Sequence, residues 1–449
     1  MNRAICFVIA AQVFLLSHTG FSQWVEQTPN LPGTGRVYVL SVVDEDTAWA
    51  LGIEFGFSSP YQGFTITHNG GNTWTGNTIP ADSNFSNSSI HAIDGRTAWV
   101  SMSDFSGATS GGIFKTTDGG ATWVQQTTAF SNPGGFANFV SFFDADDGVC
   151  MGDPTGGFFE IYTTSDGGDN WIRVPQTNIP DPLTDEFGFP SVFFLSSDST
   201  IWFGTNRGRI FRSTDRGTNW DAFDVGLGTR SVQCAFQNTE IGLAVTVFGR
   251  NIARTTDGGI TWTRLPTPPP IAGAINYIPG TESSYMICSV GAPLGTPLGS
   301  AYTLDGGASW TVIDNVDHNA AFFVNPSVGW TGSFSDVIYK WSGPTLPVEE
   351  FLPEHLPQKI SLSQNYPNPF NPETEIRFAL PEASHVVLKI FNVRGQEIRT
   401  LVDADYGAGY HSARWDGKNE SGKAAASGVY VYQFRAGSFS HVKKMLLVR

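Results

Sequence analysis

The sequence is poor in positive charge, in cysteine and in long apolar runs. Only 26 of its 449 residues are Lys or Arg, against 41 Asp or Glu. Nucleic acids and anionic lipids require a cationic surface, because binding releases the counterions around their phosphates. No nucleic-acid partner is therefore expected. The 40% of hydrophobic residues, with 34 Phe and 13 Trp, suffice for a sizeable core, so we expect two or three folded domains.

No apolar run reaches the roughly 18 residues that a membrane-spanning helix needs, so no transmembrane segment is expected. A shorter run lies at the N-terminus. Residues 1–22 combine a basic start at Arg3, an apolar stretch from Ile5 to Leu16 and small residues before Gln23. This order is typical of a secretory signal peptide.

Cysteine is too scarce for a disulfide framework or a zinc site. Beyond residue 22 only Cys150, Cys234 and Cys288 remain, each inside an apolar, strand-like segment. Their odd number and wide spacing predict buried free thiols. Neither a metal nor another cofactor is expected.

One eight-residue pattern, S/T-x-D-x-G-x-T/S/N-W, occurs six times and is called the box below. Its copies begin at residues 67, 116, 164, 213, 255 and 303, which are 49, 48, 49, 42 and 48 residues apart. Such periods are typical of propeller blades, each a four-stranded sheet. The third and eighth residues of the copies are Asn69 and Trp74, Asp118 and Trp123, Asp166 and Trp171, Asp215 and Trp220, Asp257 and Trp262, and Asp305 and Trp310.

The strands around the boxes repeat seven times, one more than the boxes themselves. The seventh third strand, residues 337–341, has no box after it. A ring must close, and Trp24-Val25-Glu26-Gln27 resembles the strands that follow the boxes. We therefore predict that residues 23–343 form a seven-bladed β-propeller in which this N-terminal segment completes the last blade and covers its edge.

The box residues are predicted to have structural roles. Glycine permits positive φ, the Asp side chain accepts hydrogen bonds from its own turn, and the Trp ring packs on a neighbouring sheet. The alternative, a calcium site at each Asp, is disfavoured because one carboxylate per turn falls short of the 6 to 8 oxygens that calcium prefers.

These motifs resemble the Asp-box (BNR) repeats of sialidases, sortilin-type receptors and tandem-propeller glucanases. Combined with the T-A-W at the start of two second strands, residues 47–49 and 97–99, they are most similar to the Ycf48/HCF136-like assembly factors of photosystem II, whose propellers have seven blades. The resemblance implies the fold strongly and an activity hardly at all.

The residues that a sialidase would need are not evident. The R-I-P motif of that family is absent, and the nearest match, around Arg209, lies in a third strand directly before a box. Asp104, Asp153, Glu160 and Asp185 are candidate acids, but the sequence does not pair them across a cleft. No catalytic residue is assigned.

The C-terminal part changes character. Residues 344–362 form a Pro-rich linker. Residues 363–449 contain alternating segments with turns at Arg394-Gly395 and Asp416-Gly417, which predict a small Ig-like antiparallel β-sandwich. The whole chain is thus expected to be all-β.

This module closely resembles the type A C-terminal sorting domain of the type IX secretion system. The motifs that carry the resemblance are N-Y-P-N-P-F-N-P, I-F-N-V-R-G, W-D-G, S-G-V-Y and a terminal K-K-M-L-L. The resemblance implies that the secretion translocon is a partner and that the protein is secreted or held on the outer surface of a Gram-negative bacterium. A plain Ig-like or carbohydrate-binding domain is the alternative. The residues assigned to sorting are Asn365, Pro367, Asn368, Pro369, Phe370, Asn371, Pro372, Gly428 and Tyr430.

The first functional hypothesis is a non-enzymatic, exported propeller that binds a glycan or a protein. Loop aromatics that could contribute, or that could simply pack, are Phe55, Phe57, Tyr61, Phe105 and Phe187. The second is a glycoside hydrolase, sialidase-like or glucanase-like, which needs two carboxyls roughly 5 to 9.5 Å apart. The third is an assembly factor for a membrane complex, by analogy with the photosystem proteins.

Overall fold

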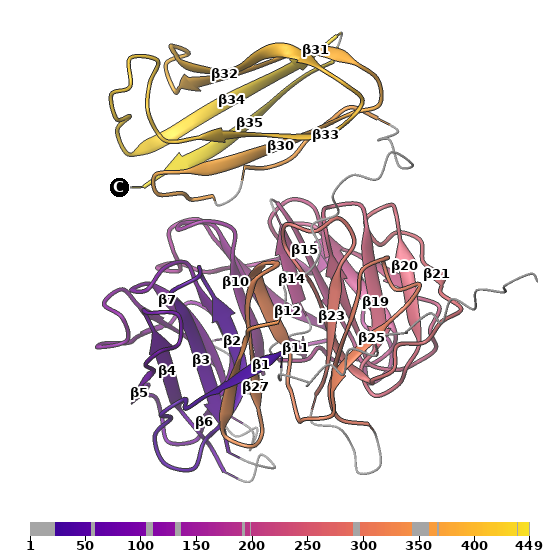
Figure 1. The fold of residues 1–449 in the computed structure, drawn as a ribbon. Helices are drawn as coiled ribbons and strands as arrows, with labels where there is room; N and C mark the ends of the chain where they lie inside the picture. The colour runs from indigo at the N-terminus through magenta and orange to yellow at the C-terminus, as the bar shows by residue number, and fades with distance from the viewer. Residues whose placement is uncertain are drawn as a thin grey trace, which may run out of the picture. The chain divides into compact units, whose positions relative to one another are not determined.

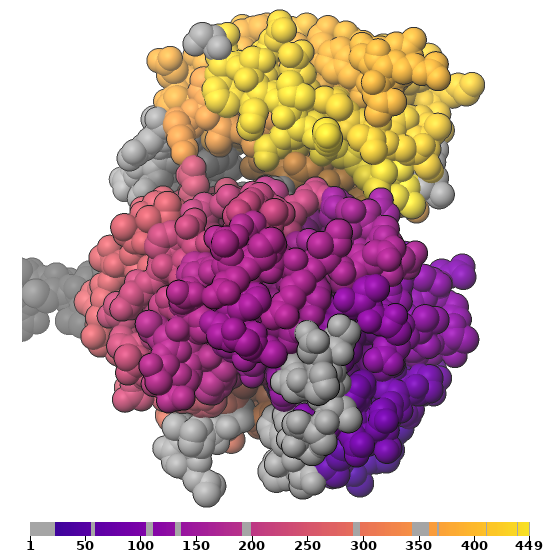
Figure 2. Space-filling view, turned by 180° about the vertical axis from the view of Figure 1, so that it is seen from behind, coloured from indigo at the N-terminus to yellow at the C-terminus, as the bar shows by residue number. Residues whose placement is uncertain are grey.

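The computed structural model divides into two compact units, residues 1–348 and 349–449, and each is described by itself. The structure describes residues 23–54, 59–104, 111–130, 136–190, 194–197, 199–343, 359–365, 368–437 and 439–448, apart from 291–296. The predicted signal peptide and most of the predicted linker lie outside these residues. Each unit is a packed body of its own (Figure 2). The described part of the chain contains no helix with the length and hydrophobicity of a membrane span.

The first unit consists of seven four-stranded antiparallel sheets (Figure 1). Blade 1 consists of β2–β5 (Arg36–Val42, Ala48–Ile53, Gly63–Thr67, Thr75–Thr78), and blade 2 consists of β6–β9 (Phe85–Ala92, Ala98–Asp104, Gly112–Thr116, Val124–Gln126). Blade 3 consists of β10–β13 (Ala137–Phe142, Gly148–Thr155, Phe158–Thr164, Ile172–Arg173), and blade 4 consists of β14–β17 (Phe194–Ser197, Thr200–Gly204, Arg209–Ser213, Asp221–Asp224). Blade 5 consists of β18–β21 (Val232–Phe236, Gly242–Thr246, Ile252–Thr255, Thr263–Arg264), and blade 6 consists of β22–β25 (Gly273–Tyr277, Tyr285–Ser289, Ser300–Thr303, Thr311–Asp314). Blade 7 is β26–β28 (Ala321–Asn325, Val328–Ser333, Val337–Trp341) with β1 (Trp24–Gln27). The predicted seven-bladed propeller is confirmed.

The core lies between neighbouring sheets. The second strands are almost entirely buried, and their tryptophans at equivalent positions, Trp49, Trp99, Trp202 and Trp330, are fully buried. Three of these indoles also donate a hydrogen bond to a carbonyl of the next blade. The acceptors are Asp94 (3.0 Å) for Trp49, Gly167 (2.9 Å) for Trp99 and Gly258 (2.9 Å) for Trp202. Blades 1, 2 and 4 are therefore joined to their successors by both apolar packing and a directed bond.

The ring is closed by the N-terminal strand, as predicted. In Figure 1 the indigo β1 lies among the orange strands of blade 7, and it pairs with β28 so that Trp24 faces Trp341 and Glu26 faces Tyr339. Trp24 is 2% exposed and packs edge-on against Trp341, with ring centroids 5.0 Å apart. Its indole nitrogen donates to Ser300 Oγ of blade 6 at 3.0 Å.

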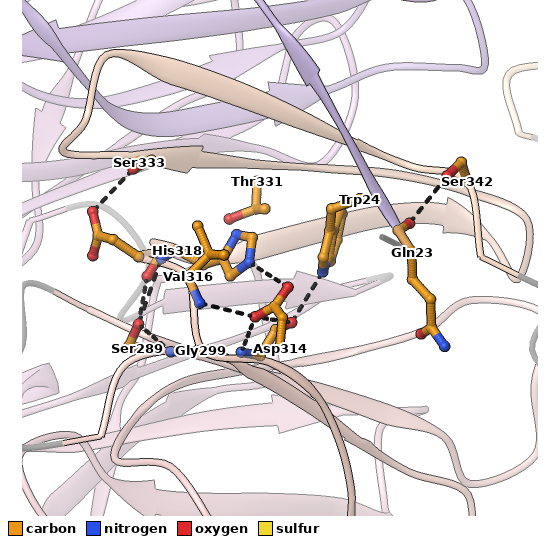
Figure 3. Close-up of polar contacts among 12 residues, drawn as sticks. Gln23, Trp24, Ser289, Gly299, Asp314, Val316, His318, Thr331, Ser333 and Ser342 are labelled. Carbon is orange, nitrogen blue, oxygen red and sulfur yellow. Dashed lines mark hydrogen bonds and ion pairs between the residues drawn. The ribbon is translucent and has the colours of Figure 1, made fainter. Parts of the chain in front are cut away.

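A buried polar group lies beside the closing strand (Figure 3). His318 is fully buried, and its Nε2 is 2.9 Å from Asp314 Oδ2. The other oxygen of this carboxylate accepts from the backbone and the hydroxyl of Ser300, the residue that also binds Trp24. The imidazole lies 5.4 Å from the Trp24 ring and 4.8 Å from Tyr339, centroid to centroid. The closing strand is thus connected to blade 6 by a chain of hydrogen bonds.

The second unit is the predicted Ig-like sandwich of two antiparallel sheets. One sheet has the order β29-β30-β33 (Ser361–Leu362, Thr374–Leu380, Gly409–Trp415), and the other has β32-β31-β34-β35 (Glu397–Tyr406, Ser384–Asn392, Gly428–Ala436, Phe439–Leu447). Fully buried Trp415, Tyr432 and Phe434 form the centre of its core. The long edge strand β32 was not predicted from the sequence, because most of its residues are partly or fully exposed and give a weak alternation.

The three cysteines beyond the predicted signal peptide are buried and free, as predicted. Cys150, Cys234 and Cys288 lie in second or first strands of blades 3, 5 and 6. Burial is the main reason why their pKa values lie above that of an ordinary thiol. They contribute to the core as small apolar side chains.

Replacing Trp24 tests the closure of the ring. Trp24→Ala should lower the free energy of unfolding by about 3 to 5 kcal/mol, because it removes a buried indole and leaves a cavity. Val25→Ala, on the same strand but at a side chain 50% exposed, should change it by less than about 0.5 kcal/mol. Urea denaturation of the full chain measures both. Equal stabilities of the two variants would contradict the closing role of Trp24.

Candidate functional site

Each box folds into the same hydrogen-bonded turn. In blade 2, Thr116 Oγ1 donates to Asp118 Oδ1 (2.9 Å) and accepts from the backbone N–H of Gly120 (3.0 Å). The two carboxylate oxygens also accept from the backbone and the hydroxyl of Thr122. The corresponding bonds recur at Asp166, Asp215, Asp257 and Asp305. Local hydrogen bonds therefore occupy the carboxylate oxygens in every acidic box.

Blade 1 shows that the box requires an acceptor and not a charge. Asn69 replaces the aspartate there, and its Oδ1 accepts from the backbone N–H of Thr73 (3.0 Å) while its Nδ2 donates to the Thr73 hydroxyl (2.9 Å). In the acidic boxes the first oxygen accepts the same backbone bond, whereas the second oxygen accepts from the side chain to which Asn69 donates. The side-chain bond from Thr122 is the main cause that lowers the pKa of Asp118 to about 2. Among the described residues, no group of three His, Cys, Asp or Glu side chains could hold a metal ion.

The box tryptophans have two kinds of position. Trp74, Trp123, Trp171 and Trp220 are buried, whereas Trp262 and Trp310 are partly exposed. Trp74 Nε1 donates to Gln27 Oε1 of the closing strand at 3.0 Å. The Trp123 ring packs edge-on against aromatic rings of the preceding blade. The Trp171 ring packs edge-on against an aromatic ring of its own blade. Box tryptophans thus pack between sheets.

Two of the candidate acids, Asp153 and Glu160, lie in the β11–β12 hairpin, where Thr155 contacts both residues, but their carboxylates have different partners. Asp153 accepts from Asn138 Nδ2 (2.7 Å) and from the Gly188 backbone (3.1 Å), and its burial raises its pKa to about 6. Glu160, fully buried, accepts from Tyr162 OH (2.7 Å). Among the described residues no side chain donates to both carboxylates.

The other two acids are also engaged elsewhere. Asp104 is buried at the end of β7. Asp185 lies in a loop with φ of 56° and forms an ion pair with Arg207 at 3.5 Å.

A buried ion pair, Glu186 with Arg209, was not anticipated from the sequence. Arg209 begins β16, and its Nε donates to Glu186 Oε1 at 3.0 Å, while Nη2 meets the other oxygen. Thr205 and the Leu183 backbone donate to the same carboxylate at 2.7 and 2.8 Å. Arg209, the nearest match to the R-I-P arginine of sialidases, is therefore already paired with a carboxylate of its own chain.

The loop aromatics are only partly described. Phe55, Phe57 and Phe105 lie outside the described residues. Tyr61 is partly buried and its hydroxyl donates to the Pro32 carbonyl, while Phe187 is 40% exposed and its ring lies 5.3 Å from that of Phe189. Tyr61 thus has a packing role, and Phe187 retains an exposed ring.

The sorting-motif residues lie against the last strand of the sandwich. We call Asn365 and residues 368–372 the strap. Phe370 pairs with β35: its N–H donates to the Leu446 carbonyl and its carbonyl accepts from Val448, both at 3.0 Å. Asn368 Oδ1 accepts from the Leu446 N–H at 2.8 Å. Two motifs that are about 75 residues apart in sequence therefore form one structural element.

Buried side chains hold the strap in place. Asn365 is 1% exposed, and its Nδ2 donates to Thr374 Oγ1 at 2.9 Å. Its backbone N–H donates to Tyr432 OH, which itself donates to the Ser363 carbonyl. Phe370, 2% exposed, packs on Trp415 with ring centroids 5.4 Å apart.

The remaining sorting residues are either exposed or lie behind the strap. Asn368, Pro369, Asn371 and Pro372 are exposed, and both prolines follow cis peptide bonds. Gly428 begins β34 opposite Leu447, and the Tyr430 ring meets Trp415 edge-on at 5.1 Å. Pro367 lies outside the described residues. The exposed side chains and the end of β35 form a surface that a partner can contact.

The fold and these motifs define a propeller of the Asp-box class followed by an Ig-like sandwich. Comparison with family models makes this more specific. The model of the photosystem II assembly factor YCF48 matches residues 101–250, and the FlgD Ig-like domain matches residues 366–438. The chain thus contains a YCF48-like BNR propeller and a C-terminal FlgD Ig-like domain. No curated protein matches the sequence.

Solved structures resemble the chain to different degrees. YCF48 bound to D1 peptide is 17% identical with a TM-score of 0.52, over 72% of this chain and 96% of that one. YCF48 from Cyanidioschyzon merolae is also 17% identical, with a TM-score of 0.49, over 71% and 98%. PorZ, a surface component of the type IX secretion system of Porphyromonas gingivalis, is 12% identical with a TM-score of 0.33, over 92% and 70%.

The role of the box carboxylate can be tested with Asp118. Its pKa is lowered from 3.8 to about 2 in the folded chain, so its stabilising effect is complete above about pH 4 and is lost as the pH falls toward 2. Asp118→Ala should lower the melting temperature at pH 7 by about 2 to 4 °C. Asp118→Asn should change it less and should remove part of the loss in acid. Thermal melts between pH 7 and 2 compare the variants, and identical acid profiles of wild type and Asp118→Asn would contradict the assignment.

The anchoring of the strap can be tested with Tyr432→Phe. The variant leaves the buried N–H of Asn365 without its acceptor, which should cost the sandwich about 1 to 3 kcal/mol. Differential scanning calorimetry of the full chain measures the change, with Val393→Ala, at a side chain 73% exposed, as the control. An unchanged transition in Tyr432→Phe would show that this hydroxyl does not anchor the strap.

Proposed function

We propose that the chain is exported through the type IX secretion system and acts outside the cell as a non-enzymatic binding protein. The single observation that supports export best is the strap. Its sorting-motif residues pair with the terminal strand and leave Asn368, Pro369, Asn371 and Pro372 exposed. A translocon could therefore read both motifs at one place. The proposed location is the outer surface or the medium of a Gram-negative bacterium, with residues 1–22 as the signal peptide.

The propeller is proposed to bind a glycan or a protein. The buried aspartates and glutamates are engaged by their own hydrogen bonds, and Arg209 is neutralised by Glu186. These contacts favour binding over glycoside hydrolysis, which requires a free acid and a free base or nucleophile on facing sides of a cleft. YCF48, which has the same fold, was solved with D1 peptide bound, so propellers of this kind can serve as binding platforms.

Export can be tested with a strap variant. In a Gram-negative bacterium that has the secretion system, Asn368→Ala should reduce the protein on the surface and in the medium at least tenfold, and the protein should accumulate in the periplasm. The variant removes the bond from Leu446 to Asn368 Oδ1, but this bond is exposed to water, so the melting temperature should fall by only a few degrees, which calorimetry checks. Val393→Ala is the control for an exposed sandwich residue away from the strap.

Two outcomes would contradict the export proposal. Normal surface delivery of a folded Asn368→Ala variant would exclude the strap as the signal. Retention of the wild-type protein in the periplasm would favour the alternative of an assembly factor for a membrane complex.

A further inference from the structure

A hollow of about 610 Å³ lies between blades 4 and 5, on the side of the propeller that carries the boxes. Its walls come from the first turn and the box of each blade. The residues that line it include Ser199, Thr214, Thr239, Thr256, Arg212 and Glu240. All the lining residues are of polar types, so the hollow offers many groups that can form hydrogen bonds.

Arg212 differs from the basic residues at the same position of other blades. The residue before the box is Lys115 in blade 2, and Lys340 is at the equivalent position of the third strand in blade 7, which has no box. Each lysine reaches the box of the following blade. Lys340 Nζ donates to the Gly70 carbonyl, at 2.6 Å, and Lys115 Nζ forms an ion pair with Asp169 at 3.4 Å. Arg212 forms no corresponding bond in the described chain, and its Nε is buried without a partner.

The box of blade 5 offers Arg212 neither of the acceptors that the two lysines use, because Ile260 stands at the position of Asp169. The carbonyl equivalent to that of Gly70 belongs to Gly258 in blade 5, and it already accepts from Trp202 Nε1 at 2.9 Å. At the corresponding junction between blades 7 and 1, Trp330 Nε1 makes no such bond. The Gly70 carbonyl there accepts from Lys340 instead. A guanidinium held in a wall with unused donors is a favourable site for an acceptor from outside the chain.

The charges around the hollow determine the kind of acceptor. Glu240 and Asp257 both line it. Burial raises the pKa of Asp257, but the bonds from Thr261 outweigh this and leave the pKa at about 2, so its charge is present at neutral pH. One guanidinium facing two carboxylates disfavours an anion. A pair of neighbouring sugar hydroxyls can accept from the guanidinium and donate to carboxylate or threonine oxygens.

We propose that this hollow binds a neutral saccharide, with Arg212 as its main hydrogen-bond donor. The inference rests on the proposed function, because it assigns a site and a ligand class to the binding role of the propeller.

The test uses the full chain and a panel of trisaccharides, namely maltotriose, mannotriose, cellotriose and chitotriose, with digalacturonate as an acidic comparison. Saturation-transfer NMR detects binding and calorimetric titration measures Kd. At least one neutral trisaccharide should bind, and Arg212→Gln should weaken it at least tenfold. The melting temperature should be unchanged, because Arg212 has no bond to lose. Arg254→Gln, at the same position before the box of blade 5, is the matched control and should bind as the wild type does.

Three outcomes would overturn the proposal. Equal binding by wild type and Arg212→Gln would leave the binding role intact but place the site elsewhere. Binding of digalacturonate alone would refute the ligand class. Absence of binding to every trisaccharide at millimolar concentration would refute the saccharide site, while the export proposal, tested by cell fractionation, would stand independently.

Discussion

The pairing of β1 with β28 closes the ring, and the packing of the other blades depends on it. Each sheet buries its faces against its two neighbours, so blade 7 and blade 1 remain covered only when the N-terminal strand is in place. Gln23 and Ser342, 319 residues apart, are joined by a backbone hydrogen bond of 2.8 Å next to this pairing. Closure of so long a loop has a large entropic cost, which the buried Trp24 and its bond to Ser300 help to offset.

Within the closed ring, local and inter-blade bonds have different tasks. The box bonds connect residues at most four apart in sequence and shape one turn each. The indoles of the second strands and the basic residues before the boxes instead connect consecutive blades. This division explains why Asn69 can replace the aspartate in blade 1. A local turn needs only a side-chain oxygen that accepts the backbone hydrogen bond, and Asn69 Oδ1 provides it. Arg212 lacks such a bond because the Gly258 carbonyl already accepts from Trp202 and Ile260 replaces the acidic residue that Lys115 meets.

The period of the boxes made most of the fold predictable from the sequence. The closing role of Trp24 followed from a missing seventh box, because a ring with one open turn needs a strand from its other end. The pair of Glu186 and Arg209 was not predictable, since Glu186 lies in an irregular loop 23 residues before its partner and no periodicity places it. The strap motif was evident in sequence, but its contact with Leu446 depends on long-range register. Similarly, Arg212 is distinctive only when its bonds are compared with those of Lys115 and Lys340.

Charge is consistent with a neutral ligand for the propeller. Residues 1–350 contain 32 acidic and 14 basic residues, whereas residues 351–449 contain 9 and 12. An acidic glycan approaching the propeller would meet repulsion beyond the contact distance, although salt confines this repulsion to about 8 to 10 Å. A neutral saccharide has no such barrier, and its affinity arises from hydrogen bonds to groups that are already fixed. Arg212 is such a group, because its neighbours hold it in the wall of the hollow before any ligand arrives.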